Sequence, residues 1–147
     1  MTVTYEWRGE FGNDEVESLH GEGFGHEKAA HDWWAQLSRH SLGWVCARGE
    51  VAADAAGGST QAGDGALVGF VNVAWDGAAH AFILDTVVAL AARHQGVGVG
   101  LVVEAERRAR AAGCEWLHVD FEEELAAFYF EACGFRPTPA GLIRLKG

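Results

Sequence analysis

The sequence predicts a single α/β (α+β) domain over residues 1–147, and three observations support this. Strand-like and helix-like segments alternate along the chain, the most apolar strand leads to a glycine-rich turn that opens a helix, and no repeat or linker interrupts them. A chain of 147 residues has the length of one domain, and its 49% hydrophobic and 22% charged residues are typical of a globular protein with a packed core.

The N-terminal part predicts one strand and two helices. Residues 3–7 alternate and are rich in β-branched and aromatic side chains, which indicates a strand. An Asn-Asp pair offers a cap for a helix over about 13–20. The glycines of 21–25 predict a mobile loop, and a second helix is expected over about 26–39.

Three strands are expected in the middle of the chain. Residues 43–48 and 66–75 have strand patterns, and the stretch 49–65 between them has few residues to bury, so it is predicted to be an extended hairpin loop. Asp76 and Gly77 form a turn signal that joins antiparallel strands. The turn leads to 81–90, the most apolar run of the chain and the expected central strand.

After this strand the pattern changes to helical spacing. The glycine-rich turn 95–100 opens a helix that Gly113 ends. A short strand over 116–120 and a short helix over 123–132 follow. The tail is expected to supply a last pair of strand-like segments that two prolines split.

Charge and cysteine usage narrow the class of protein. Eleven basic and 21 acidic residues give a net charge of −10, which argues against nucleic acid and favours a cationic substrate, although acidic surfaces also promote solubility. The three cysteines cannot all pair and none lies in a CxxC motif, so we expect reduced thiols in a cytoplasmic protein. No signal peptide or membrane span is evident, and no membrane partner is expected.

The glycine-rich turn carries the strongest chemical signal. A strand that runs through such a turn into a helix aims backbone N–H groups at one point, an arrangement that binds phosphate without lysine. Neither the dinucleotide fingerprint GxGxxG nor a Walker A motif fits the residues. The alternative is that the glycines only allow tight packing.

The same residues resemble the GNAT family of N-acetyltransferases. The cofactor-binding signature of that family is Arg or Gln, two residues, Gly, one residue, then Gly or Ala, and the turn from Gln95 to Gly100 meets it at every position. The segment Cys133–Pro137 resembles the closing Gly-Phe element of the family. The resemblance covers about 66–145 well and the N-terminal part only in the order of its elements.

The resemblance implies a fold and a cofactor. It implies a mixed, mostly antiparallel central sheet with helices on both faces and a V-shaped splay between the parallel strands 81–90 and 116–120, where acetyl-CoA binds. The pyrophosphate would lie on the backbone N–H groups of the turn, the pantetheine arm would pair with the end of the central strand, and the amine would approach from the other side. The cofactor-binding residues so implied are Val88, Leu90, Gln95, Gly96, Val97, Gly98, Val99 and Gly100.

Acetyl transfer needs a base for the amine and an acid for the leaving thiolate. Asp85 interrupts the apolar strand, where an unpaired carboxylate is costly and a raised pKa would suit a base; its alternative is a carboxylate that caps a loop or faces solvent. His118 and Asp120 share one face of their strand, so His118 is either a water-linked base or a histidine satisfied by its neighbours.

Tyr129 is the candidate acid. Members of the family commonly place a tyrosine four positions before the Gly of the Gly-Phe element, and here Phe130 occupies that place. A shift of one residue turns a helical side chain by about 100°. Tyr129 therefore serves as the acid only if the helix is locally adjusted.

Two further groups of residues allow more than one interpretation. The seven histidines lack zinc-type spacing, so no metal is expected. Four aromatic residues, Tyr5, Trp33, Trp34 and Trp75, either wall an acceptor pocket or pack in the core.

The residues and the resemblance together predict an N-acetyltransferase. The enzyme would move the acetyl group of acetyl-CoA to a primary amine of a small molecule or peptide by direct attack in a ternary complex. The alternatives are an acyl-CoA-binding module without transferase activity, for which the displaced tyrosine is the main argument, and an interaction protein that keeps only the fold. A homodimer is compatible with the C-terminal strands, which in such a fold often leave an edge to be covered.

Overall fold

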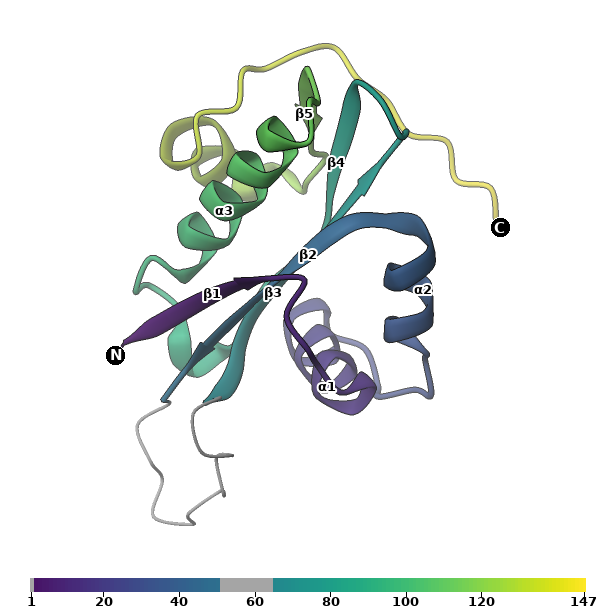
Figure 1. Cartoon of the computed structure of the whole chain (residues 1–147). Helices are drawn as coiled ribbons and strands as arrows, with labels where there is room; N and C mark the ends of the chain where they lie inside the picture. Colours follow the sequence, from purple (N-terminus) through teal and green to yellow (C-terminus); the bar gives the residue numbers. More distant parts are fainter. Residues whose placement is uncertain (1, 51–64) are drawn as a thin grey trace.

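The computed structural model describes residues 2–50 and 65–147, which form a five-stranded sheet with its strands in sequence order (Figure 1). β1 to β4 are antiparallel, and β4 and β5 are parallel but pair over only three residues each. The fold class expected from the sequence is confirmed. Most of the predicted loop over 49–65 lies outside the described residues. The strands are β1 Val3–Trp7, β2 Ser41–Gly49, β3 Ala66–Trp75, β4 His80–Val88 and β5 Trp116–His118.

Helices cover both faces of the sheet (Figure 1). α1 (Asn13–Phe24) and α2 (Trp33–His40) pack on one face around a buried cluster that includes Val87. α3 (Val97–Ala111) packs on the other face, where its apolar side chains join those of β2, β3 and β4. Within residues 2–50 and 65–147, none of the helices has the length and apolar character needed to cross a bilayer.

The turn between β3 and β4 forms as the sequence predicts. One carboxylate oxygen of Asp76 accepts the backbone N–H groups of Ala78 at 2.7 Å and His80 at 3.1 Å. Gly77 takes a φ of 84°, which favours glycine. This short turn sets β4 antiparallel to β3 and fixes which residues of β4 face α1.

The predicted loop over 21–25 is wrong, because α1 continues to Phe24 and ends only at Gly25, whose φ is 73°. A Cβ on Gly23 would clash with the side chain of Val87, so this glycine lets α1 approach β4 closely. The second helix is also shorter than expected. It starts at Trp33, where Asp32 caps it by accepting the N–H of Ala35 at 3.0 Å.

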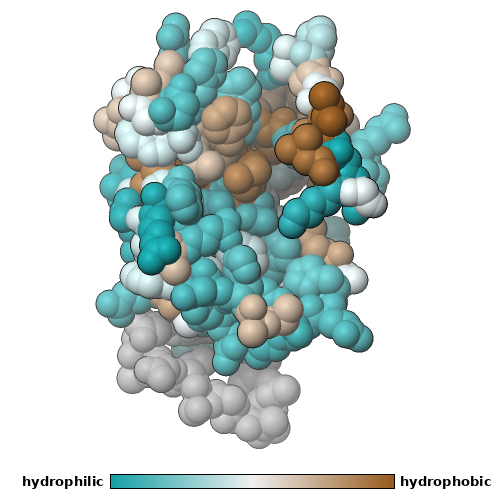
Figure 2. Space-filling view, turned by 90° about the vertical axis from the view of Figure 1, so that its right-hand side faces the viewer, coloured by the Kyte–Doolittle hydropathy of each residue, from teal (hydrophilic) through white to brown (hydrophobic). Residues whose placement is uncertain are grey.

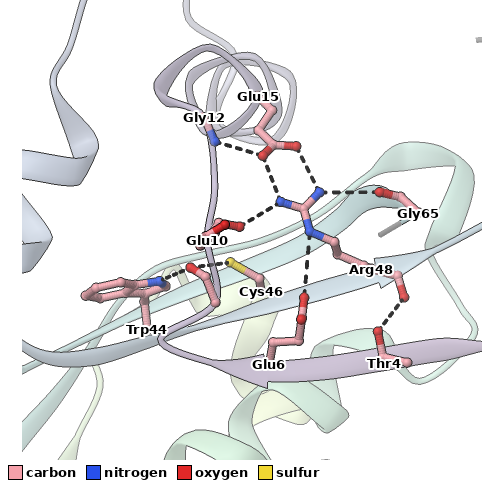
Figure 3. A network of polar contacts seen from close by, with 10 residues as sticks. Thr4, Glu6, Glu10, Gly12, Glu15, Trp44, Cys46, Arg48 and Gly65 are labelled. Atoms are coloured by element: carbon pink, nitrogen blue, oxygen red, sulfur yellow. Dashed lines mark hydrogen bonds and ion pairs between the residues drawn. The ribbon is translucent and has the colours of Figure 1, made fainter. Parts of the chain in front are cut away.

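Arg48 of β2 anchors the start of α1 to the sheet (Figure 3). Its guanidinium donates to both carboxylate oxygens of Glu15, at 2.9 and 2.7 Å, and to the carbonyl of Glu10 at 3.0 Å. One Glu15 oxygen also accepts the N–H of Gly12 at 2.8 Å. Burial alone would raise the pKa of the Glu15 carboxyl, but these hydrogen bonds and the Arg48 charge hold it below 4.5.

The C-terminal part departs most from the sequence prediction. β5 ends at His118, two residues early, and the expected helix over 123–132 is a 3-10 turn, η2 (Glu123–Leu125), followed by a π-helix, η3 (Ala127–Ala132). Residues 136–147 form no strand. This tail passes over the top of Figure 1 and ends near the α2 side.

Candidate active site

A β-bulge lies in the middle of β4. Phe70 of β3 pairs with Val87 and Asn72 pairs with Leu84, so Asp85 and Thr86 together oppose one β3 residue. Asp85 has a φ of 58°, in the left-handed region that aspartate enters more readily than most residues. The predicted run 81–90 therefore contains a break in the strand, and the strand itself ends at Val88.

The bulge directs two adjacent side chains to different partners. The Asp85 carboxylate lies 3.0 Å from Nε2 of His20, on α1, and its side chain is 25% exposed. The Thr86 side chain instead faces Tyr129, which comes from η3, and lowers the pKa of its phenol. The carboxylate is thus neither unpaired nor a loop cap, and Asp85 and the strand residue that faces Tyr129 are neighbours in the sequence.

The π-helix supplies the local adjustment that Tyr129 needs. The N–H of Cys133 donates to the carbonyl of Phe128, five residues back, at 2.9 Å. Tyr129 is only 5% exposed and stacks on Phe121 with ring centroids 4.6 Å apart. Burial raises its pKa, and the Thr86 side chain partly opposes that rise. The phenol is therefore protonated at neutral pH and can donate a proton.

The glycines of the turn have different physical roles. Gly96 caps α3 with a φ of 81°, and a Cβ on it would meet nothing within 4 Å in the described part of the chain. Gly98 lies against the ring of Phe128, and a Cβ on Gly100 would clash with Tyr5. Two of the glycines thus allow tight packing of α3, while Gly96 leaves open space in front of the helix. Gln95, Val97 and Val99 complete the turn, where no described side chain caps the first N–H groups of α3.

The end of β4 carries the backbone groups expected to bind a pantetheine arm. The carbonyl of Val88 accepts from Nε of Arg93 at 3.3 Å. The N–H of Leu90 donates to the Glu22 carboxylate, which comes from the last turn of α1, at 2.6 Å. A side chain that the sequence did not single out therefore holds one of these groups.

His118 lies away from this constellation. Its Nε2 is 2.7 Å from Nδ1 of His80, and its ring stacks on Phe82 at 4.7 Å. His118 pairs with Phe82, which precedes Asp85 by three residues of β4. His118 and Asp85 are therefore about 10 Å apart along the strand. His118 thus contacts His80 and Phe82, its catalytic role stays a prediction, and Asp120 follows the strand instead of sharing its face.

An open cavity of about 850 Å³ lies beneath the tail. His118 and Asp120 line it together with Trp116 and residues 136–140. Neither Asp85 nor Tyr129 lines it, so this cavity is separate from the bulge.

The four aromatic residues considered for an acceptor wall do not share one. Tyr5 and Trp75 pack against the cluster on the α3 face, whereas Trp33 is buried and Trp34 is 40% exposed on the opposite face. Trp33 and Trp34 pack with Leu37, Trp44 and Phe11. Packing, the alternative interpretation, accounts for most of them.

Sequence reasoning missed His20, Thr86 and Glu22. His20 and Asp85 are 65 residues apart, and Glu22 and Leu90 are 68 apart, so no local spacing links them. The only available signal was the polar pair Asp85 and Thr86 within an apolar strand, which marks the bulge but not its partners.

Comparisons with known proteins agree with this fold. The model of the acetyltransferase (GNAT) family matches residues 10–135. No curated protein matches the chain. The fold is similar to that of an acetyltransferase from Trypanosoma brucei, with 19% identity, a TM-score of 0.72 and coverage of 96% of this chain and 99% of the other.

Two further solved structures are similar. Glucosamine-6-phosphate N-acetyltransferase from Arabidopsis thaliana shares 15% identity with a TM-score of 0.72, over 98% of this chain and 99% of its own. The protein AAC(6')-Iy, solved in complex with the bisubstrate analog CoA-S-monomethyl-acetylneamine, shares 18% identity with a TM-score of 0.63, over 100% and 99%. Since the family model spans most of the chain, from before α1 to the end of η3, this chain belongs to the GNAT acetyltransferase family.

Proposed function

We propose that this protein transfers the acetyl group of acetyl-CoA to a primary amine of a small molecule or peptide, by direct attack in a ternary complex. The observation that carries the proposal is the bulge of β4, which turns Asp85 toward α1 and the next residue, Thr86, toward Tyr129 of η3. The Asp85 carboxylate pairs with His20, and Tyr129 is a buried phenol whose pKa is raised. One group can accept a proton and the other can donate one.

The proposed reaction assigns each proton. Asp85 takes a proton from the ammonium group of the acceptor, and the neutral amine attacks the thioester carbonyl. The new C–N bond forms, the C–S bond breaks, and the thiolate of CoA leaves with the hydroxyl proton of Tyr129. The nitrogen of the new amide then gives its extra proton to the Tyr129 phenolate, directly or through a water molecule, so that the net proton of the reaction stays on Asp85. In this proposal His118 takes no part in the proton transfers and lies at the far end of the acceptor face, stacked on Phe82.

The cofactor would bind along the end of β4 and the start of α3. The pyrophosphate would lie on the turn from Gln95 to Gly100, in front of the open space at Gly96, where the N–H groups of α3 have no described side-chain cap. The pantetheine arm would bind the backbone of Val88 and Leu90, displacing Glu22 from the Leu90 N–H. The bisubstrate complex of AAC(6')-Iy supports a CoA ligand on this fold.

The acceptor would lie on the face of β4 that is turned toward α1. Phe82 and Leu84 on this face are 37% and 41% exposed, next to Asp85. Figure 2 shows one side of the molecule, with apolar surface gathered in its upper half. An amine with an apolar body would place its ammonium group at the carboxylate and its body on these side chains.

The cysteines support direct attack over a covalent acyl-enzyme. Burial raises the pKa of Cys46 to about 12 and that of Cys133 to about 11, and it also raises the pKa of Cys114. Since the thiolate is the nucleophile, these thiols are inactive at neutral pH. The adjusted position of Tyr129 also weakens the main argument for a binding module without activity.

A second copy of the chain is the proposed partner of the C-terminal tail. Leu142, Ile143 and Leu145 are 80%, 86% and 93% exposed, which is costly for three large apolar side chains so close together. β5 pairs only with β4 among the described strands, so its other edge is open. A two-fold dimer would bring the tail of each copy to the other.

The first test is a thermal-shift titration with acetyl-CoA, CoA, NAD and ATP. A ligand that binds only the native state raises the apparent stability with the logarithm of its excess over Kd. We expect a shift with acetyl-CoA and CoA only, followed by release of free CoA thiol when primary amines are added. The absence of any shift with both CoA species would overturn the proposal.

A further inference from the structure

Two histidines extend the Asp85 carboxylate into a chain of hydrogen bonds that reaches the surface. Nε2 of His20 lies 3.0 Å from the carboxylate, and Nδ1 of His20 lies 2.6 Å from Nε2 of His26. Nδ1 of His26 lies 2.8 Å from the backbone carbonyl of Glu27. This chain of hydrogen bonds therefore joins β4, α1 and the connection from α1 to α2.

The end of this chain fixes how its protons are arranged. A backbone carbonyl only accepts, so Nδ1 of His26 must carry a proton to bond Glu27. Nε2 of His26 is then the acceptor for the Nδ1 proton of His20. Each neutral ring carries one proton, on Nδ1, and these two protons make the hydrogen bonds to Glu27 and between the two rings. The hydrogen bond between His20 and Asp85 requires a third proton. The assembly thus has a state with two protons, in which Asp85 is ready to accept, and a state with three.

The surroundings suit a charge that moves outward. The side chains of Asp85 and His20 are 25% and 16% exposed, whereas that of His26 is 39% exposed, so water reaches the outer ring most easily. The Glu17 carboxylate lies 3.9 Å from Nδ1 of His26 and accepts the backbone N–H of Ala29 and the indole N–H of Trp33, at 2.8 and 2.9 Å. The hydrogen bond from Ala29, followed by that from Trp33, holds the pKa of Glu17 below its usual range.

We propose that His20 and His26 relay to solvent the proton that Asp85 takes from the acceptor. The proton passes from Asp85 to Nε2 of His20, and the Nδ1 proton of His20 passes to Nε2 of His26. His26 then releases its Nδ1 proton to water, which leaves two ring protons, both now on Nε2. Proton exchange of the rings with water returns these protons to Nδ1 before the next turnover. Glu17 stays ionised and stabilises the transient positive charge. His20 and His26 are positioning residues, because they act through Asp85, and the inference rests on the proposed transferase function.

The relay also explains the packing of His20. Its ring lies between the rings of Phe24 and Trp33, at centroid distances of 4.3 and 5.0 Å. These contacts fix the orientation of the ring and leave its side chain only 16% exposed. The titratable groups that face His20 are Asp85 from β4, His26 from the connection and Glu17 from its own helix.

The test compares His20→Gln, His20→Ala and His26→Ala with His40→Gln, a histidine at the exposed end of α2. Glutamine can keep one hydrogen bond of His20 but cannot pass a proton on. We expect kcat to fall about 100-fold or more in His20→Gln and His20→Ala, with the KM for acetyl-CoA unchanged, because proton transfer steps of this kind contribute about 10²–10⁴ in rate. Added imidazole should restore turnover to His20→Ala and His26→Ala in proportion to its concentration, and should have no effect on Asp85→Asn.

The outcomes separate the two proposals. If the wild type shifts with acetyl-CoA and acetylates an amine while His20→Gln keeps the wild-type kcat, the relay alone is overturned. The relay is also overturned if both alanine variants lose turnover, retain the CoA-induced thermal shift and do not respond to imidazole. If the wild type binds no CoA species, both proposals fail together. Should His20→Ala not fold, the more exposed His26→Ala provides the same rescue measurement.

Discussion

Arg48 shows how one buried charge can fix the position of a helix that carries site residues. Its side chain is 9% exposed, and its ion pair with Glu15 joins β2 to the first turn of α1. The same helix carries His20 and Glu22 in its last turns. A change at Arg48 therefore acts first on stability and only through the helix on the site.

We expect Arg48→Met to lower the free energy of unfolding by about 2–3 kcal/mol. Loss of one partner of a fully buried pair costs about 3–5 kcal/mol, and Glu15 is 37% exposed, which reduces the effect. Urea unfolding measures it. Arg107→Met is the control, because its pair with Glu104 is exposed on the Arg side and should contribute under about 1 kcal/mol. Equal losses in both variants would contradict the role of Arg48.

The same pair predicts a pH dependence. Because the folded pKa of Glu15 is below 4.5, its contribution is fully present above that value and is lost as pH falls through the folded pKa. The difference in unfolding free energy between the wild type and Arg48→Met should therefore shrink as the pH is lowered from 7 to about 3. A difference that stays constant over this range would show that the ion pair contributes nothing.

Tyr129 allows a second test at the residue scale. Tyr129→Phe should reduce kcat about 10-fold to 100-fold while CoA still raises the melting temperature, because only the proton donor is lost. Adding Phe130→Tyr to this variant should not restore activity, because the π-helix presents position 129, not 130, to Thr86. Restoration by the tyrosine at 130 would show that the helix has the ordinary register.

At the scale of elements, the sequence predicted the strands better than the connections. β3 was predicted at its observed bounds because a turn signal and a change of polarity mark both ends. The extent of α1 was missed because Gly23 is there for contact with Val87, which no local pattern reveals. The π-helix was missed for the same reason, since its widened turn brings Tyr129 to a strand more than 40 residues earlier in the chain.

Substitutions of the glycines at the start of α3 are expected to differ in their effects on stability and on CoA binding. Gly100→Ala should destabilise the fold, and Tyr5→Ala in the same chain should recover part of the loss, because the added methyl group would clash with the Tyr5 ring. Gly96→Ala should cost only about 1–2 kcal/mol of backbone strain but should weaken CoA binding. Thermal unfolding with and without CoA separates the two effects. Additive losses from Tyr5→Ala and Gly100→Ala would contradict this interpretation.

At the scale of the whole molecule, the topology was predictable and the assembly was not. The order of elements and the glycine turn lead to a mixed sheet with one parallel pair, as observed. The tail, however, contains strand-like residues that find no partner among the described strands, and a single sequence does not show what covers them.

The tail predicts the oligomeric state. The protein should behave as a dimer in size-exclusion chromatography with light scattering. The triple variant Leu142→Ser, Ile143→Ser and Leu145→Ser should be monomeric with an unchanged fold, because these side chains are already in water within one chain. The control is Leu125→Ser, an exposed leucine outside the tail. A wild type that is monomeric at every concentration would exclude the dimer.

The contact between Glu22 and the Leu90 N–H has a kinetic consequence. Two residues of α1, about half a turn apart, reach different parts of the site. His20 contacts Asp85 on the acceptor side, and Glu22 accepts the Leu90 N–H just after β4. A cofactor arm that replaces Glu22 releases the end of this helix before the acceptor is in place. The protein should therefore bind its substrates in a compulsory order, cofactor first. A non-reactive acceptor analogue should then inhibit uncompetitively against acetyl-CoA, and Glu22→Ala should convert this pattern to a random one.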